Sequence, residues 1–302
     1  KGEEMMNSQQ YIQFRDMIGQ PVNDNIRNLV NKYGISTDWR DEMIKNSAPT
    51  SDINATLQGG GQTMNYFVSF NHHQEDGLIE DSNMRRSTLA ARINSRLNKF
   101  FKVGFSSNFG VQDYSQNSMW ADSKKTYASN PLVAAKMALP YDTPYYYSFD
   151  EAGNLVKGDR AAGLLYSQFL LPWFTVANTK QDRKNVTINL SLNEQFTPLE
   201  GLTFTALQSL FGYDLTADRA SLPYEQFTTP MGQVIDAHTG GVASDFSRYY
   251  AYTLTHTAEF RHNFGPHYVN LLLGEETRIQ KGRSFGITST GQTDVRRMLL
   301  NT

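Results

Sequence analysis

The run from Met84 to Asn98 constrains the fold more than any other part of the chain. Small and apolar side chains alternate strictly with polar ones along it. The small and apolar positions are Ser87, Leu89, Ala91, Ile93, Ser95 and Leu97, and the polar positions are Arg86, Thr88, Arg92, Asn94, Arg96 and Asn98. Because strand side chains point alternately to opposite faces, the run predicts a strand with one apolar and one hydrophilic face. Such a strand suits a soluble sandwich, or a transmembrane barrel with lipid outside and a wet lumen inside.

Seven further segments resemble this run to different degrees. The clearest alternation occurs in Phe101–Gln112, Asn185–Asn193 and Tyr250–Arg261. Weaker alternation occurs in Asp52–Gln58, Asn65–Gln74, Leu202–Asp214 and Tyr268–Gln280. In the last two segments it fails at Ala206-Leu207 and at Leu271–Leu273, where we expect a bulge or a change of face. The sequence therefore predicts roughly eight antiparallel strands.

The connections between these segments alternate in length, which distinguishes the two architectures. Short connections lie at 59–63, near 99, at 197–201 and at 263–266, whereas medium and long ones lie at 76–83, 115–180, 216–247 and from 281 onward. Short and long connections therefore fall at opposite ends of the strands. Outer-membrane barrels have short periplasmic turns and long extracellular loops. A soluble sandwich seldom has structureless loops of this length, so the barrel is the favoured fold.

The first fifty residues have helical patterning instead. Asn7 or Ser8 can cap a first helix, a second follows Pro21, and Thr37 or Asp38 can cap a short third one. The first strand must descend toward a short turn, so we expect residues 1–50 to form a helical extracellular loop and residues 51–302 to form transmembrane strands with long outer loops. By the same reasoning, we expect the chain to be an internal fragment of a larger barrel.

Composition excludes several classes of function. There is no cysteine, and therefore no disulfide or thiolate metal site. The chain has 28 basic and 30 acidic residues, and this balance weakens the case for a nucleic-acid partner. We find no phosphate-binding loop, nucleophile elbow or zinc motif, so we expect no enzyme activity, no cofactor and no metal site. His72-His73 near Glu75 is a poor metal site, because neighbouring strand residues point to opposite faces.

Several motifs, taken in their order and spacing, resemble the SusC/RagA class of TonB-dependent outer-membrane receptors of Bacteroidetes. They are Met6 to Tyr11, Thr37 to Glu42, Ala48-Pro49, Gly59-Gly60, Asn65 to Ser69, Gln74 to Ile79, Arg85 to Asn94, Phe101 to Gly104, Thr253 to Thr257 and Leu272 to Glu276. The resemblance touches most of the expected strands, whereas the long loops match nothing that we can identify.

This resemblance implies an all-β fold, namely a barrel of about 22 antiparallel strands with a plug domain inside it. It also implies energy from the TonB complex, through parts outside this chain, and a SusD-like surface lipoprotein that closes the outer face. The implied function is import of a bulky nutrient across the bacterial outer membrane, with an oligosaccharide as the favoured cargo. An oligopeptide importer of the RagA type is the alternative, as is a surface adhesion protein that transports nothing.

Two groups of residues are candidates for functional contacts. Arg86, Arg92 and Arg96 share one strand face, where they either attract anions into the lumen or contact a plug; plug contact is the favoured interpretation. The first long loop is rich in aromatic residues, whose flat faces can stack on sugar rings or can simply pack the loop. The candidates for substrate contact are Trp120, Tyr141, Tyr145, Tyr146, Tyr147 and Trp173.

Overall fold

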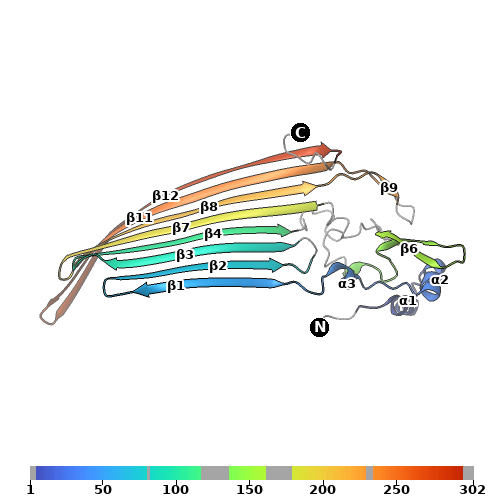
Figure 1. Cartoon of the computed structure of the whole chain (residues 1–302), viewed down its shortest axis with the longest axis horizontal. Coiled ribbons are helices and arrows are strands. Elements are labelled where there is room, and N and C mark those ends of the chain that lie inside the picture. Colours follow the sequence, from blue (N-terminus) through green and yellow to red (C-terminus); the bar gives the residue numbers. More distant parts are fainter. Residues whose placement is uncertain (1–4, 80–81, 117–135, 161–178, 229–233, 295–302) are drawn as a thin grey trace.

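Eight long strands form one curved antiparallel sheet in a computed structural model that describes residues 5–79, 82–116, 136–160, 179–228 and 234–294 (Figure 1). The strands are β1 Thr50–Gly60, β2 Met64–Asp76, β3 Asn83–Arg96, β4 Phe101–Gln116, β7 Thr179–Leu199, β8 Leu202–Ser221, β11 Gly240–Phe264 and β12 His267–Gln292. Their order in the sheet is β1-β2-β3-β4-β7-β8-β11-β12, so each strand pairs with the next long strand in the sequence. Among the described strands, β1 and β12 each have one neighbour and do not pair with each other. The eight predicted strands are confirmed, and they form an open wall.

Short turns lie at one end of this wall, and the helices of the first fifty residues lie beyond the other, which we call the outer end (Figure 1). Two predictions about the strands are wrong. Residues 216–221, 240–247 and 281–292 were expected in loops but belong to β8, β11 and β12. No bulge occurs at Ala206-Leu207 or at Leu271–Leu273, because the backbone pairing runs without a shift through both sites. Hydrogen bonds between backbones set the register, and these bonds tolerate an apolar side chain on either face.

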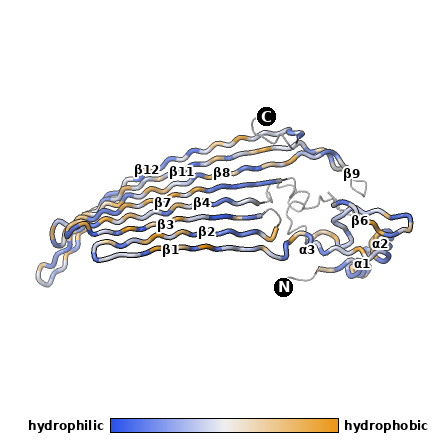
Figure 2. The backbone as a smooth tube through the Cα atoms, viewed as in Figure 1, coloured by the Kyte–Doolittle hydropathy of each residue, from blue (hydrophilic) through white to orange (hydrophobic). Residues whose placement is uncertain are grey.

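The strand register separates two faces of the wall. Arg92 pairs with Phe67 on β2 and with Ser106 on β4, and small polar residues continue this polar face across the sheet. Ile93 pairs with Tyr66 and Phe105, and these residues belong to the opposite, apolar face. Figure 2 shows the resulting alternation of hydrophobic and hydrophilic positions along the strands. The pattern that identified the strands therefore also determines which way their side chains point.

Three helices precede the wall, as predicted. They are α1 Ser8–Met17, α2 Asp24–Tyr33 and α3 Trp39–Met43. The side chain of Asn7 accepts a hydrogen bond from the backbone N–H of Gln10, whose own side chain bonds back to Asn7, so α1 begins with a capping box. Asp38 caps α3 in a similar way, by accepting from two backbone N–H groups of its first turn. No helix in the described ranges is long and apolar enough to cross a membrane.

The helices pack against part of the first long loop, residues 139–160, which contains the hairpin β5 Tyr145–Phe149 and β6 Leu155–Arg160. We call residues 7–44 and 139–160 together the outer module. Its core contains Ile12, Ile26, Val30 and Tyr141. The indole N–H of Trp39 donates to the carbonyl of Leu139 at 2.8 Å, which ties α3 to the loop. A second short hairpin, β9 Phe227–Thr228 with β10 Val234–Ile235, also lies beyond the outer end of the wall (Figure 1).

Candidate functional site

The polar face contains a broad open hollow midway along the strands. Small side chains form its floor, which keeps the space above the sheet free. Residues of the polar face that line it are Phe67, Ala90, Arg92, Ser106, Asn108, Asn189, Ser191, Ser209, Phe211, Ala251, Thr253 and Arg278. The hollow therefore offers hydroxyl and amide groups in the middle, with a cation and an aromatic ring from each half of the wall.

The three arginines proposed from the sequence do lie on this face. Arg86, Arg92 and Arg96 lie an even number of residues apart on β3 and so share one face, and all three are exposed. Only Arg92 lines the hollow. Arg86 lies nearer the outer end beside His73, and Arg96 lies at the short-turn end beside Lys102. None of the three has an ion-pair partner among the described residues, so whether a plug or a cargo meets them stays a prediction.

Two features of the polar face were missed by the sequence analysis. Arg278 on β12 enters the hollow opposite the β3 side, and the irregular hydropathy of Leu271–Leu273 obscured the face to which it belongs. The rings of Tyr213 and Tyr249 stack across β8 and β11 with centroids 5.6 Å apart, and Phe211 lies 6.1 Å from each. Cross-strand pairing of aromatic residues could have revealed this cluster only if the register had been known.

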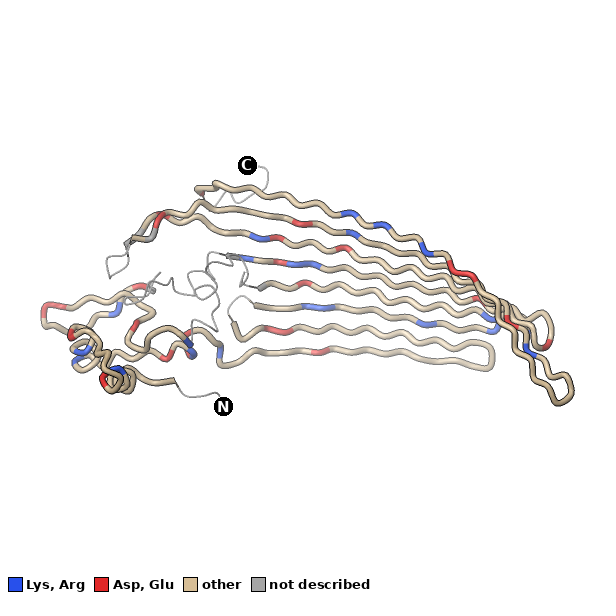
Figure 3. Tube along the Cα trace, turned by 180° about the vertical axis from the view of Figure 1, so that it is seen from behind, with Lys and Arg blue, Asp and Glu red and all other residues tan. Residues whose placement is uncertain are grey.

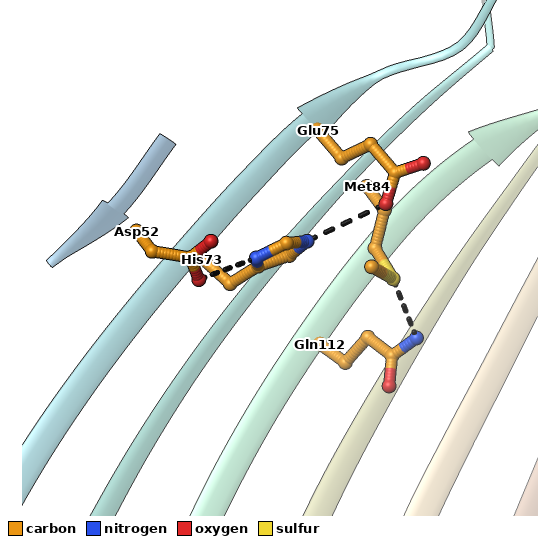
Figure 4. Close-up of polar contacts among 5 residues, drawn as sticks. All are labelled: Asp52, His73, Glu75, Met84 and Gln112. Atoms are coloured by element: carbon orange, nitrogen blue, oxygen red, sulfur yellow. Dashed lines mark hydrogen bonds and ion pairs between the residues drawn. The ribbon is translucent and has the colours of Figure 1, made fainter. Parts of the chain in front are cut away.

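A small polar network lies near the outer end of β1 and β2 (Figure 4). The Nδ1 atom of His73 lies 2.7 Å from a carboxylate oxygen of Asp52, and its Nε2 atom lies 3.4 Å from Glu75. His72 points to the other face, where it contacts the hydroxyl of Ser87 at 2.9 Å. The two histidines therefore point apart. Within the described part of the chain, no group of three potential ligands is arranged to hold a metal ion.

Four of the six candidate aromatic residues lie in the described part of the outer module, whereas Trp120 and Trp173 lie outside the described residues. Tyr141 is only 8% exposed and meets the ring of Tyr11 edge-on at 5.8 Å. Burial raises the pKa of Tyr141 to about 12, and the neighbouring Tyr11 and Asp142 add to the shift. Tyr141 thus packs the module and presents little surface to a ligand.

The other three tyrosines lie on β5 and are partly exposed. The ammonium group of Lys157 covers the ring of Tyr145, with 3.4 Å between Nζ and the ring centroid. Tyr147 contacts Phe149, which in turn packs on Tyr33 of α2 with ring centroids 5.0 Å apart. Tyr147, Phe149 and Tyr33 therefore join the hairpin to α2 through their rings. Tyr146 and Tyr147 remain partly exposed and retain surface for a ligand.

The apolar face is interrupted by polar residues in its second half. Gln208 on β8 accepts a hydrogen bond from the Tyr252 hydroxyl at 3.0 Å and donates to Glu194 at 3.4 Å. Next to them, His256 contacts Glu275 at 2.9 Å. These groups satisfy one another within the wall, as His72 and Ser87 do between β2 and β3 on the same face.

Comparison with known proteins gives two kinds of match. No family model matches the chain. TonB-dependent receptor P3 of Formosa agariphila is 23% identical over 244 residues, which are 79% of this chain and 22% of that receptor. TonB-dependent receptor P26 of the same organism is 24% identical over 78 residues, which are 26% of this chain and 8% of that receptor. The chain thus spans a minor part of the length of both relatives.

Solved structures match almost the whole chain. A chain of the RagAB peptide transporter aligns with a TM-score of 0.72 and 19% identity, covering 99% of this chain and 35% of that one. The RagAB peptide importer in its open-open state gives a TM-score of 0.73 and 20% identity, covering 99% and 34%. At these identities the structural match shows the shared fold.

A curved wall of long antiparallel strands, apolar on one face and polar on the other, defines a segment of an outer-membrane β-barrel. The apolar face is then the lipid side and the polar face lines the lumen. The chain is thus similar in sequence to TonB-dependent receptors and shares its fold with a chain of the RagAB transporter, in line with the resemblance of its motifs to the SusC/RagA class.

Proposed function

We propose that this chain forms part of the wall and outer rim of a receptor that imports a bulky nutrient across the outer membrane. The observation that carries the proposal is the combination of a transmembrane wall with a structured module at its outer end. A wall alone would serve a simple pore. A packed rim of helices and an aromatic hairpin offers a surface that can capture a large solute before it enters the lumen.

An oligosaccharide is the favoured cargo. The rings of Tyr146 and Tyr147 are partly exposed on the hairpin, and Tyr213 and Tyr249 stack on the lumen side. Flat aromatic rings match the apolar faces of sugar rings, and the amides and hydroxyls of the hollow match sugar hydroxyl groups. Oligopeptide import is the second candidate, because the structural relatives are described as a peptide transporter and importer.

Two partners belong to this proposal. A SusD-like lipoprotein would close the outer end over the module, and the TonB complex would supply energy through parts of the receptor outside this chain. The relatives named as TonB-dependent receptors and the RagAB assembly support both partners. Import is also what separates this function from surface adhesion, because adhesion needs no energy coupling.

The experiment is to purify the whole receptor in mild detergent, release its bound molecules and identify them by mass spectrometry. Uptake of the molecule found is then measured in cells with and without TonB. We expect an oligosaccharide whose uptake needs TonB. Bound peptides would favour the second candidate, oligopeptide import, over oligosaccharide import. Uptake that is unchanged without TonB would refute energised import.

A double variant tests whether the partly exposed tyrosines of β5 bind the cargo. Tyr146→Ala combined with Tyr147→Ala should weaken cargo binding by about thirtyfold, since stacking on each ring contributes about 1 kcal/mol. The matched control is Tyr268→Ala, because Tyr268 is an exposed tyrosine at the short-turn end of the wall. Equal cargo binding by the double variant and the Tyr268→Ala control would exclude Tyr146 and Tyr147 from the cargo site.

A further inference from the structure

Charged residues form a belt on the lipid side of the wall, at the outer border of the apolar band. On β4 the outward-facing residues run from Phe101 to Val111, and the next outward residue is Asp113. This band is roughly ten residues long, which is the length that a tilted strand needs to cross the hydrocarbon core. The same band ends at a charged residue on five other strands, giving Arg85 on β3, Lys184 on β7, Asp214 on β8, Arg248 on β11 and Lys281 on β12.

On the central strands of this belt, positive and negative charges balance. Asp113 is the cross-strand neighbour of Arg85 and lies 4.0 Å from the ammonium group of Lys184. Asp214 accepts two hydrogen bonds from the guanidinium of Arg248, at 2.7 and 2.5 Å. Each acidic residue here thus has its cation.

This charge balance is absent on β12, which carries an excess of positive charge. Lys281 and Arg283 are consecutive outward positions of this strand, and Arg283 is the cross-strand neighbour of Arg248. Neither Lys281 nor Arg283 has an acidic partner within ion-pair distance among the described residues. Figure 3 shows basic positions following one another along β12. The carboxylate of Asp214 is therefore bonded to Arg248 alone, and the two cations of β12 add positive charge beside this pair.

An aromatic pair lies directly above these cations. Phe246 on β11 and Phe285 on β12 are cross-strand neighbours with ring centroids 5.3 Å apart. The guanidinium of Arg248 lies 5.5 Å from the Phe246 ring, and that of Arg283 lies 5.9 Å from the Phe285 ring. Below the cations, Tyr250 and Ile279 continue the apolar band.

We propose that Arg248, Lys281 and Arg283 bind the phosphate of a phosphorylated glycolipid in the outer leaflet. The order of the groups along the strands fits such a lipid from bottom to top. Acyl chains would lie on the apolar band, the phosphate would meet the cations, and the sugar ring would stack on Phe246 and Phe285. A free phosphate ion would use the cations alone. The proposal needs only the membrane placement of the wall and is independent of the cargo.

The test is a lipid titration of the whole receptor in mild detergent, followed by native mass spectrometry, with purified lipid A as the probe. The Lys281→Gln/Arg283→Gln double variant should bind lipid A about thirtyfold more weakly than wild type, as expected for the loss of two cations near an anionic headgroup. The Lys184→Gln variant is the matched control, because Lys184 faces the same way in the belt but is paired with Asp113. The charge-conserving Lys281→Arg/Arg283→Lys variant should keep wild-type binding.

Two further arms identify the ligand group. Lipid A without its phosphates should bind the wild type as weakly as intact lipid A binds the double variant. Millimolar inorganic phosphate should not displace intact lipid A from the wild type. Heat-modifiable migration in gels will confirm that each variant forms its barrel. Equal binding by wild type and double variant, equal weakening by Lys184→Gln, or tight binding of the stripped lipid would overturn the proposal. Displacement by inorganic phosphate would show a free-anion site instead.

Discussion

The wall and the outer module are stabilised in different ways. Of the eight apolar residues that are buried in the described chain, six lie in the outer module and only Ala217 and Ala251 lie in the wall. The module excludes water with its own side chains, as a soluble domain does. The wall instead exposes long rows of Leu, Ile and Phe on one face, so its folding depends on lipid outside and on neighbouring parts of the barrel. One chain therefore combines a region that is folded by its own core with a region that is folded by its surroundings.

The largest effect should come from removing the anchor of the module. Trp39 is 3% exposed and its indole donates to Leu139, so Trp39→Ala should destabilise the module by about 3–5 kcal/mol. Hydrogen exchange of the whole receptor should show faster exchange in α1–α3, β5 and β6 and unchanged exchange in β2–β4, β7 and β8. Met17→Ala is the control, because Met17 lies on α1 and is 78% exposed. Faster exchange throughout the wall would show that the two regions fold as one unit.

The second prediction tests the two faces of the wall. Leu190 faces lipid near the middle of β7, and Leu190→Arg should destabilise the inserted barrel by about 2–4 kcal/mol. Its neighbour Ser191 faces the lumen, so Ser191→Arg should cost far less. Urea unfolding of the receptor in lipid vesicles measures both. Similar costs for the two variants would contradict the assignment of faces.

The third prediction concerns the turn that joins β7 and β8. Gly201 has φ of +87°, and a Cβ atom there would lie 2.1 Å from the carbonyl oxygen of Arg261. Gly201→Ala therefore meets both an unfavourable backbone conformation and a clash, and should destabilise the barrel by about 2–3 kcal/mol.

Gly265 in the last turn is the matched control for this variant. Its φ is +61°, and an added Cβ would have no neighbour within 4 Å. Gly265→Ala should therefore cost only about 1 kcal/mol. Measured in the same urea series, a smaller effect at Gly201 than at Gly265 would show that the β7–β8 turn can move away from Arg261.

The wall could be predicted well because its alternation has one physical cause. Lipid on one side and water on the other force residues such as Ile188 and Asn189 to alternate, and the alternation is visible without any structure. Beyond the lipid band both faces of a strand are wet, so the cause disappears. The outer ends of β8, β11 and β12 carry no alternation for this reason, and the sequence analysis placed them in loops.

The candidate site was less predictable for a related reason. An aromatic residue in a loop has the same local sequence signal whether it packs a core or faces a ligand. Tyr141 and Tyr146 are five positions apart and both were candidates, but Tyr141 packs on Tyr11 whereas Tyr146 lies on a partly exposed hairpin. Contacts between α1 and residues near 141 decide this difference, and such distant contacts leave no periodic trace in the sequence. Arg278 was missed because only the register places it opposite Thr253.

The smallest effect that we predict is a pH dependence confined to the outer module. The pKa of Tyr141 is raised to about 12 by burial, whereas an unfolded tyrosine ionises near pH 10. The folded module therefore holds this proton more tightly than the unfolded one does. The contribution of Tyr141 to the stability of the module is complete below about pH 10 and is lost as the pH rises toward 12, with about 1 kcal/mol gone by pH 11.

The protease resistance of the module between pH 8 and 11 should show this loss of stability, and Tyr141→Phe should abolish the pH dependence. Tyr268→Phe, which changes an exposed tyrosine, should leave it unchanged, and an equal loss in Tyr141→Phe would assign the pH dependence to another group.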